Sequence, residues 1–140
     1  MVNDRDIREG RICPYCGSEP EFVDSDAVYS RSYGMIYLCR PCSAWVGVHR
    51  GSRKALGRLA DADLRERKRE GHYYFDNLWR RKMLKDKVSK GIARRGAYAW
   101  LSQTMGIDPD QCHIGMMDDT ECLAVIMLCK PHYRPIEKLH

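Results

Sequence analysis

Two Cys-x-x-Cys pairs constrain this chain more than any other feature of its sequence. They read C-P-Y-C-G from Cys13 and C-R-P-C-S from Cys39, and 22 residues lie between them. Each pair can place two thiolates on one side of an ion, and the chain between the pairs is long enough to return as a hairpin. Gly17 allows the positive φ that a tight metal-binding turn often needs. The pattern predicts one tetrahedral site with four ligands: Cys13, Cys16, Cys39 and Cys42.

Four thiolate ligands favour a single Zn²⁺ ion, with one rubredoxin-like iron as the alternative. A closed four-cysteine site leaves no open position for water or substrate, so it predicts a structural ion rather than catalysis. Such an ion also crosslinks a hairpin that has little core of its own. The competing interpretation, two pairs of ordinary core cysteines, is disfavoured by the spacing of the two pairs.

The composition fits a cytoplasmic protein. The sequence has no N-terminal apolar run typical of a signal peptide, and no apolar stretch of about 18 residues that would predict a membrane span. The odd count of seven cysteines favours a reducing compartment and a metal over a disulfide scaffold. We therefore expect a soluble protein without membrane contact.

Positive charge is concentrated in the middle of the chain. The formal net charge is +5, but residues 50–95 hold 16 Lys and Arg against 6 Asp and Glu, while the remainder holds 8 against 13. A basic middle flanked by acidic ends produces a focused field rather than a diffuse one. This asymmetry directs the search for a partner toward anionic molecules.

The order of the segments predicts an α+β fold, in which an N-terminal zinc ribbon packs against about four helices as a single cooperative unit. Strands are expected at residues 21–24, 27–32, 33–38 and 44–48, forming a small antiparallel sheet of three or four strands. Trp45 is expected to cover the metal site. The predicted divisions are a lead-in at 1–11, the ribbon at 12–49, a basic helical part at 50–133 and a tail at 134–140.

Capping residues predict where the helices begin. Asp61, Ser89 and Asp118 are suitable N-caps, and Gly106 fits just beyond the C-terminus of the middle helix. The expected helices cover residues 62–75, 90–105 and about 119–129. Trp79 is expected to mark the transition from the first of these helices to a second basic segment.

The basic residues predict a nucleic-acid-binding surface, contacting phosphates in a mostly sequence-independent and salt-dependent way, with DNA favoured over RNA. The candidate contacts are Arg50, Arg53, Lys54, Arg58, Arg65, Arg67, Lys68, Arg69, Arg80, Arg81 and Lys82. Solvated loop and helix faces are the alternative interpretation. An acidic protein partner, with the chain as an adaptor or an inhibitor of a host enzyme, is the alternative function. The sequence does not indicate the oligomeric state.

Catalysis has little support in the sequence. A metal-dependent enzyme acting on nucleic acid would rely on His49, His72 or His113 in a functional pocket, yet no H-E-x-x-H or deaminase pattern is present. A second metal site is conceivable from five donors: Cys112, His113, Cys122, Cys129 and His132. Because Cys122 and Cys129 lie seven apart on an apolar helix, packing is the stronger interpretation for them.

Several runs of sequence resemble small zinc-finger-containing proteins of phages and bacteria. They are C-P-Y-C-G, L-C-R-P-C-S-A-W-V-G-V-H-R-G-S-R-K-A-L-G-R-L-A-D-A-D-L-R, H-Y-Y-F-D-N-L-W from His72, A-Y-A-W-L from Ala97 and C-H-I-G-M-M-D from Cys112. The resemblance extends over residues 12–130 and implies the zinc site and a phage or prophage context. It also draws attention, without assigning roles, to His49, Gly51, Leu56, Gly57, His72, Asp76 and residues 113–115.

Overall fold

The computed structural model describes residues 3–136 of the chain. The chain divides into two compact units. The ribbon unit comprises Met1–Arg65 and Gly115–Asp118, and the helical unit comprises Glu66–Ile114 and Asp119–His140. The division between the units falls after Arg65, and the predicted boundary at residue 50 stays a prediction. The expectation of a single cooperative unit concerns unfolding and stays a prediction.

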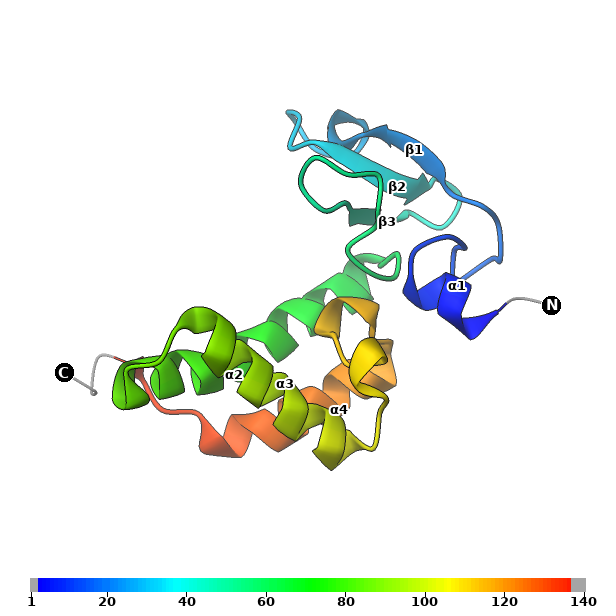
Figure 1. Ribbon diagram of the computed structural model, residues 1–140. Helices are drawn as coiled ribbons and strands as arrows, with labels where there is room; N and C mark the ends of the chain where they lie inside the picture. The colour runs from blue at the N-terminus through cyan, green and yellow to red at the C-terminus, as the bar shows by residue number, and fades with distance from the viewer. Residues whose placement is uncertain (1–2, 137–140) are drawn as a thin grey trace. The chain divides into compact units, whose positions relative to one another are not determined.

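The ribbon unit contains a three-stranded antiparallel sheet, as predicted, and the fold is α+β. Its strands are β1 (Glu21–Asp24), β2 (Met35–Cys39) and β3 (Ala44–Gly47), in the order β1-β2-β3 (Figure 1). The register pairs Tyr37 with Phe22 on one side and with Val46 on the other. Because side chains alternate along a strand, Tyr37 and Cys39 face one side of β2 and Leu38 faces the other.

The expected strand at 27–32 is not formed, and local side-chain hydrogen bonds explain why. A short 3₁₀ helix, Ser25–Ala27, begins at Asp24, whose carboxylate accepts from the Asp26 N–H at 2.9 Å and from the Ser32 hydroxyl at 2.9 Å. The buried Ser25 hydroxyl accepts from the Tyr33 N–H at 2.7 Å. Short polar side chains thus offer the backbone partners that a strand would otherwise supply.

The predicted lead-in at 1–11, of which residues 1–2 lie outside the described part, contains a helix that the sequence analysis missed. Helix α1 (Asp4–Arg8) begins at Asn3, whose side chain accepts from the Arg5 N–H at 2.7 Å. The Arg8 and Asp4 side chains form an ion pair at 2.8 Å, one turn apart. Capping and close ion pairs stabilise a segment that shows no hydrophobic period.

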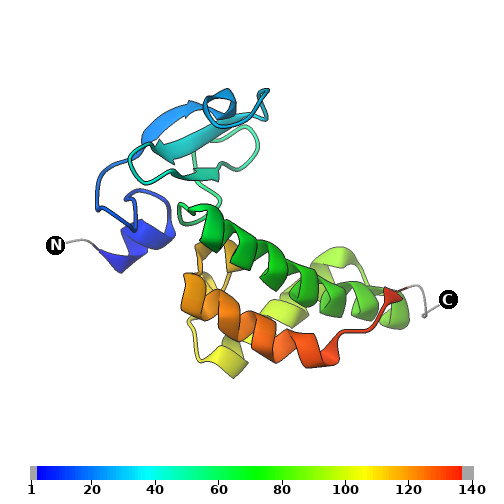
Figure 2. The ribbon, with the colours of Figure 1, turned by 180° about the vertical axis from the view of Figure 1, so that it is seen from behind.

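The helical unit contains most of α2 (Ala62–Asp86), together with α3 (Lys90–Met105) and α4 (Asp119–Cys129), which lie side by side in two opposite views (Figure 1, Figure 2). Helix α3 has the predicted bounds: the Ser89 hydroxyl accepts from the Ile92 N–H at 3.2 Å, and Gly106 has φ 69°. The four α-helices of the described chain are α1 to α4.

Helix α2 does not end at residue 75. It continues through Trp79 to Asp86, because Phe75 and Trp79 lie one turn apart and are both buried. The transition expected at Trp79 is therefore absent, and the helix is followed by Lys87 with φ 54°. The core of this unit consists of Phe75, Trp79, Ala93, Leu101, Cys112, Ile114, Cys122, Val125, Ile126 and Cys129.

The segment after α4 is held to α2 by a buried amide. The Asn77 side chain donates to the Arg134 carbonyl at 2.8 Å and accepts from the Arg134 N–H at 3.3 Å. Arg134 is therefore not part of a free tail, and residues 137–140 of the predicted tail lie outside the described residues. In the part of the chain that is described, no helix is long and apolar enough to cross a membrane.

Candidate metal centre

The structure brings the four predicted ligands together. Cys13 and Cys16 lie between α1 and β1, Cys39 ends β2, and Cys42 lies in the turn that leads to β3. All four Sγ atoms lie within 4.8 Å of one another, and the Cys16 and Cys39 sulfurs are 3.6 Å apart. Residues that are 23 or more positions apart in sequence thus meet because β1 and β2 form a hairpin.

Each Cys-x-x-Cys pair adopts a tight turn that aims its two sulfurs to one side. In the first turn the Gly17 N–H donates to the Cys13 carbonyl at 2.9 Å, and Gly17 has φ 77°, as the sequence predicted. In the second turn the Ser43 N–H donates to the Arg40 carbonyl at 3.1 Å, and Ser43 takes a positive φ of 50°. Such a conformation is uncommon for a residue with a Cβ atom.

The cluster fits one tetrahedral zinc ion. With Zn–S bonds of about 2.3 Å, the sulfurs of a tetrahedral site lie about 3.8 Å apart. The Cys16 and Cys39 sulfurs, 3.6 Å apart, lie close to this value and the other pairs lie within 4.8 Å, so an ion requires only modest side-chain movements. The donor set is all thiol, which suits zinc, and it is complete without solvent. The role of such a site is structural: these four residues would hold the ion, and the ion would crosslink the hairpin.

The metal cluster is covered by the face of the sheet that carries the cysteines. Cys13 and Cys39 form a buried core with Ala44 and Leu59, and Tyr37 and Val46 pack against it. Because Ala44 and Val46 lie two positions apart, they share one face of β3. This cover excludes water from one side of the site and favours a structural role.

Trp45 does not cover the metal site, contrary to our expectation. It lies between Ala44 and Val46, so its side chain leaves the opposite face of β3. There the indole donates to the Tyr29 hydroxyl at 3.1 Å and packs edge-on against that ring at 5.9 Å. The Arg65 guanidinium lies over the indole, 3.5 Å from the ring centroid. The aromatic residue therefore supports the second face of the sheet.

The thiols of the site differ in acidity. The Ser18 hydroxyl and its backbone N–H donate to the Cys16 sulfur and lower the pKa of that thiol to about 6. Removal from solvent, followed by the neighbouring sulfurs, raises the pKa of Cys42 to about 12, and burial raises the pKa of Cys39. Four thiolates repel one another at these distances, and a bound dication would relieve that repulsion.

The donors considered for a second metal site are not brought together. Among residues 3–136 the four-cysteine cluster is the only group of three or more Cys, His, Asp or Glu donors close enough to hold an ion. Cys122 and Cys129 are fully buried in the apolar core, and burial raises the pKa of Cys129 to about 11. The His113 ring packs against Tyr98 at 5.3 Å.

The three histidines of the predicted pocket belong to different units: His49 to the ribbon unit, and His72 and His113 to the helical unit. His72 Nδ1 lies 3.6 Å from an Asp76 carboxylate oxygen. Burial, together with the nearby Arg94 guanidinium, holds the pKa of His113 below its ordinary value. A shared functional pocket stays a prediction.

Asp76 lies between His72 and Trp79 and contacts both. Its carboxylate accepts from the Trp79 indole N–H at 2.8 Å. Burial alone would raise the pKa of Asp76, but hydrogen bonds from His72 and Trp79 and the charge of Arg80 hold it below its ordinary value. The carboxylate thus gives the indole N–H of Trp79, which is only 5% exposed, its partner.

Replacing Asp76 is expected to reduce stability in a pH-dependent way. Asp76→Ala leaves the buried Trp79 N–H unpaired and should lower the free energy of unfolding by about 1–3 kcal/mol at pH 7, whereas Asp76→Asn keeps an acceptor and should cost less. Because the folded-state pKa lies below the ordinary value of about 3.9, the stabilisation is present above pH 4 and is lost as pH falls through the lowered pKa. Urea unfolding at two pH values measures this, and an equal deficit of Asp76→Asn at pH 7 and near pH 3 would contradict it.

Three of the predicted phosphate contacts also donate hydrogen bonds to backbone carbonyls within the protein. Arg58 is only 8% exposed, and its Nε donates to the Met116 carbonyl at 3.2 Å. Arg65 lies on Trp45 and donates to the Ala60 carbonyl, and Arg81 donates to the His132 carbonyl at 2.5 Å. These guanidinium groups hold backbone segments in place, and their contact with nucleic acid stays a prediction.

The remaining candidates are on the surface. Arg50, Arg53 and Lys54 are exposed in the turn that follows β3, and the Arg53 guanidinium lies over the Phe22 ring at 4.1 Å. On α2, Arg67, Arg69, Arg80 and Lys82 are exposed and Lys68 is half-buried. Arg69 pairs with Glu66, and Lys82 pairs with Asp86 at 3.2 Å. Their contact with nucleic acid stays a prediction.

The sequence did not predict two features of the structure, one in the helical unit and one in the ribbon unit. Lys90 and Arg94, both on α3, lie near the Trp79 ring of α2. No local pattern in the sequence predicts this contact between two helices. Gly57 lies against Gly115, and the Arg58 N–H donates to the Gly115 carbonyl at 3.0 Å. This contact explains the glycines in two of the runs that carry the family resemblance.

Comparison with known proteins agrees with this geometry. A family described as a zinc-finger-containing domain matches residues 9–132, which covers most of the chain and all four cysteine ligands. No curated protein and no solved structure matches the chain. With the match extending over both units and the four thiols gathered as a zinc site requires, the chain belongs to this family of zinc-finger-containing domains.

Proposed function

We propose that this protein binds nucleic acid through the phosphates of its backbone, with the zinc ion stabilising the ribbon unit and the helical unit supplying the contacts. The observation that carries the proposal is the distribution of charge between the units. The ribbon unit holds 10 Lys and Arg against 10 Asp and Glu, and the helical unit holds 14 against 9, which together give the totals of 24 and 19. The whole excess of +5 therefore lies in the helical unit.

A cluster of cations around Trp79, which we call the Trp79 cation cluster, supports the proposal. Arg80, Lys90 and Arg94 are exposed, and their charged groups lie 5.2, 5.6 and 5.9 Å from the centroid of the indole ring. Cations near an aromatic face are attracted by its quadrupole, so the buried indole gathers three of them in one place. Clustered Arg and Lys groups on a surface are suited to phosphate contacts.

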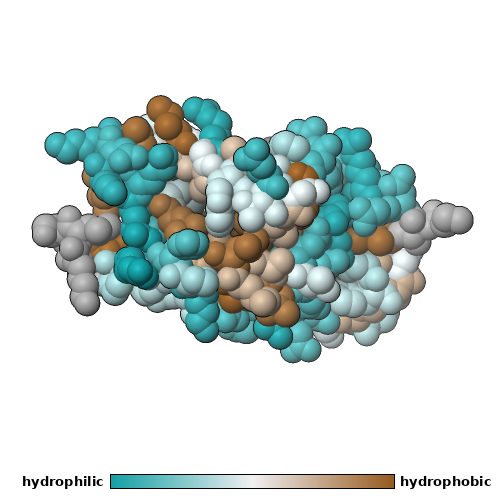
Figure 3. Space-filling view, turned by 90° about the horizontal axis from the view of Figure 1, so that it is seen from below, coloured by the Kyte–Doolittle hydropathy of each residue, from teal (hydrophilic) through white to brown (hydrophobic). Residues whose placement is uncertain are grey.

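The acidic residues near this cluster are engaged locally. Asp86 pairs with Lys82 one turn away on α2, and Asp76 accepts from the Trp79 N–H. In Figure 3, hydrophilic residues cover much of the molecular face drawn, and hydrophobic and intermediate residues gather between them. The three cations gathered at Trp79 favour an anionic partner.

Binding is expected to be independent of sequence. Readout of base edges needs side chains carried into a groove by a recognition element, and the sequence shows no such motif. Contacts to phosphates instead produce a steep dependence of affinity on salt, because each contact releases condensed counterions. The proposal includes a cytoplasmic location and a phage or prophage origin; all seven cysteines are free thiols, which favours a reducing compartment.

Two triple variants with equal loss of charge test the proposal. One replaces Arg80, Lys90 and Arg94 with Gln in the helical unit, and the other replaces Arg50, Arg53 and Lys54 with Gln in the ribbon unit. For duplex DNA the slope of log affinity against log salt should become shallower by about 2.7 in the first variant, because each lost phosphate contact removes about 0.9. The second variant should keep a slope close to that of the unchanged protein, because this proposal places the contacts in the helical unit rather than at Arg50, Arg53 and Lys54, which the sequence suggested.

The comparison separates a contact surface from a general effect of net charge. Both variants lose three positive charges, so a long-range effect of net charge would weaken both equally. Fluorescence anisotropy with a labelled random duplex provides the affinities at four or more salt concentrations. If the two slopes change equally, or if only the ribbon variant becomes shallower, the helical unit is not the interface and the proposal fails.

A further inference from the structure

The helical unit carries a cavity of ≈390 Å³ whose lining combines aromatic and cationic groups. Its lining residues come from α2, α3 and the segment after α4: Leu78, Arg81, Trp100, His132 and Arg134. None of the five is acidic. The size lies within the range of small-molecule sites, which begins at about 300 Å³. Such a lining suits a ligand with a flat, apolar body and a negative charge.

Trp100 provides the flat surface. Trp100 lies on α3 and is 37% exposed, a large exposed fraction for a tryptophan. The His132 ring meets the indole nearly at a right angle, with centroids 6.5 Å apart. This edge-to-face contact holds the two rings in a defined arrangement. An exposed indole held in this way can stack against a planar heterocycle.

Two arginines provide the positive charge, and both are fixed in position. Arg81 donates from Nη1 to the His132 carbonyl at 2.5 Å, while its Nε is buried without a hydrogen-bond partner. The Arg134 backbone is held by Asn77, and its Nη1 donates to the Tyr133 carbonyl at 2.7 Å. A guanidinium has five N–H donors, so both groups retain donors for an anion.

We propose that this cavity binds one nucleotide, with the base stacked on Trp100 and the phosphate held by Arg81 and Arg134. The shared chemistry is a nucleobase with an attached phosphate, supplied either by a free nucleotide or by the terminal nucleotide of a single strand. The second source deepens the proposed nucleic-acid binding and rests on it. The first does not depend on any contact made by the Trp79 cation cluster.

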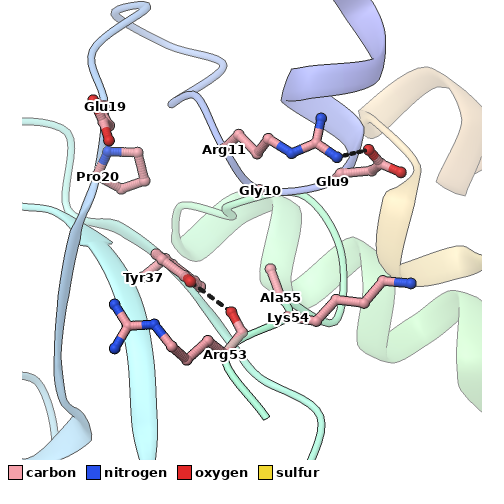
Figure 4. Close-up of a pocket in the computed structure, with 9 residues that line it drawn as sticks. All are labelled: Glu9, Gly10, Arg11, Glu19, Pro20, Tyr37, Arg53, Lys54 and Ala55. Carbon is pink, nitrogen blue, oxygen red and sulfur yellow. Dashed lines mark hydrogen bonds and ion pairs between the residues drawn. The ribbon is translucent and has the colours of Figure 1, made fainter.

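A second cavity, in the ribbon unit, is lined in part by acidic residues and is therefore less suited to a phosphate. It has a volume of ≈310 Å³, and its lining includes Glu9, Glu19, Arg53 and Lys54 (Figure 4). Arg11 also lines it, but its guanidinium is paired with the Glu9 carboxylate at 2.6 Å. Two carboxylates would repel a phosphate, so this cavity provides a matched control of similar size.

Calorimetric titration with three small molecules tests the recognition chemistry. Adenosine monophosphate carries both the base and the phosphate, whereas adenosine lacks the phosphate and ribose 5-phosphate lacks the base. We expect the monophosphate to bind more tightly than either fragment. Loss of stacking should weaken binding by about fivefold to 150-fold, and loss of the charged hydrogen bonds should weaken it by about tenfold or more.

Substitutions assign the binding to the cavity. Trp100→Ala and Arg134→Gln should each weaken binding of the monophosphate by about fivefold or more, while Lys54→Gln, which removes one charge from the ribbon cavity, should leave it unchanged. Trp100→Phe keeps an aromatic surface and should retain most of the affinity, which shows whether a loss in Trp100→Ala comes from stacking. Arg134 is exposed, so its variant is expected to remain folded.

The same variants distinguish the source of the nucleotide. If the monophosphate binds poorly, a single-stranded oligonucleotide with a 5′-phosphate is compared with one lacking it; a preference that Trp100→Ala abolishes assigns the site to a strand end. The proposal is overturned if neither probe binds, or if Trp100→Ala and Arg134→Gln bind both probes as the unchanged protein does. Binding to duplex DNA and its salt slope should persist in Trp100→Ala, so failure here leaves the proposed function intact.

Discussion

Removal of zinc is expected to unfold the ribbon unit. Its sheet has three strands of four or five residues, and two of the four residues in its buried cluster, Cys13 and Cys39, are zinc ligands. Structural zinc contributes about 10–16 kcal/mol of apparent binding free energy in small zinc-binding peptides, comparable with the about 5–15 kcal/mol that stabilises a whole domain. Without the ion, the remaining apolar contacts cannot offset the entropy of ordering the chain.

Cys39→Ser tests this expectation against a control in the other unit. The variant should lose bound zinc in native mass spectrometry, and the amide NMR signals of the ribbon unit should collapse toward random-coil positions. Cys122→Ala removes a fully buried thiol from the helical core, so it should lose some stability but keep one zinc ion per chain. Retention of full zinc stoichiometry and of the ribbon signals by Cys39→Ser would show that the site is wrongly assigned.

Replacing Gly57 with Ala is expected to produce the second large effect. A Cβ atom at this position would fall on the backbone carbonyl of Gly115, well inside van der Waals contact. Backbone cannot move aside as the end of a flexible side chain can, so Gly115 would have to shift and the Arg58 N–H bond to its carbonyl would be strained. Overpacking costs about 1–3 kcal/mol and occasionally more, and we expect about 3 kcal/mol here.

Gly91→Ala is the matched control, because it makes the same chemical change where nothing lies within 4 Å of the new Cβ. Gly91 lies in the first turn of α3, and Ala is the better helix former, so this variant should be equal in stability or more stable by up to about 1 kcal/mol. Thermal unfolding measures both variants: Gly57→Ala should melt about 10 °C lower or more. Equal melting temperatures would mean that the close contact between Gly57 and Gly115 is absent in solution.

The zinc ligands could be predicted because each Cys-x-x-Cys pair is a local pattern that is typical of metal ligands. Cys13 and Cys39 each begin a four-residue turn whose geometry hardly depends on the rest of the chain, and the match of Gly17 to a positive φ is likewise local. The bounds of α3 were predictable for the same reason, since Ser89 and Gly106 satisfy the helix ends through neighbouring residues. Local signals therefore identified the metal site and the best-defined helix.

Features that depend on distant contacts were missed. The side of the sheet on which Trp45 lies follows from strand register, and a shift of one residue moves every side chain to the other face. Arg58 and Arg81 look like surface cations in the sequence. Yet Arg58 donates to the carbonyl of Met116, 58 positions away, and Arg81 donates to the carbonyl of His132, 51 positions away. No local pattern reports such partners.

The extent of α2 was missed because packing overrides local signals. Asp61 was correctly identified as a cap, since its side chain accepts from the Leu64 N–H at 2.9 Å. Basic residues follow Trp79, and their polarity suggested a change of segment. The buried pair Phe75 and Trp79 instead anchors the helix, so the cations project from one continuous element. Arg80 joins the Trp79 cation cluster from α2, whereas Lys90 and Arg94 join it from α3.

Salt-dependent binding of the zinc-loaded protein tests the central claim most directly. The protein is titrated with random duplex DNA, single-stranded DNA and RNA over a range of salt concentrations. We predict binding at low salt, with log affinity falling linearly with log salt and a slope for duplex DNA of about −2.7 or steeper, as three or more phosphate contacts require. No binding at low salt, or an affinity that does not change with salt, would contradict the claim that the helical unit binds nucleic-acid phosphates.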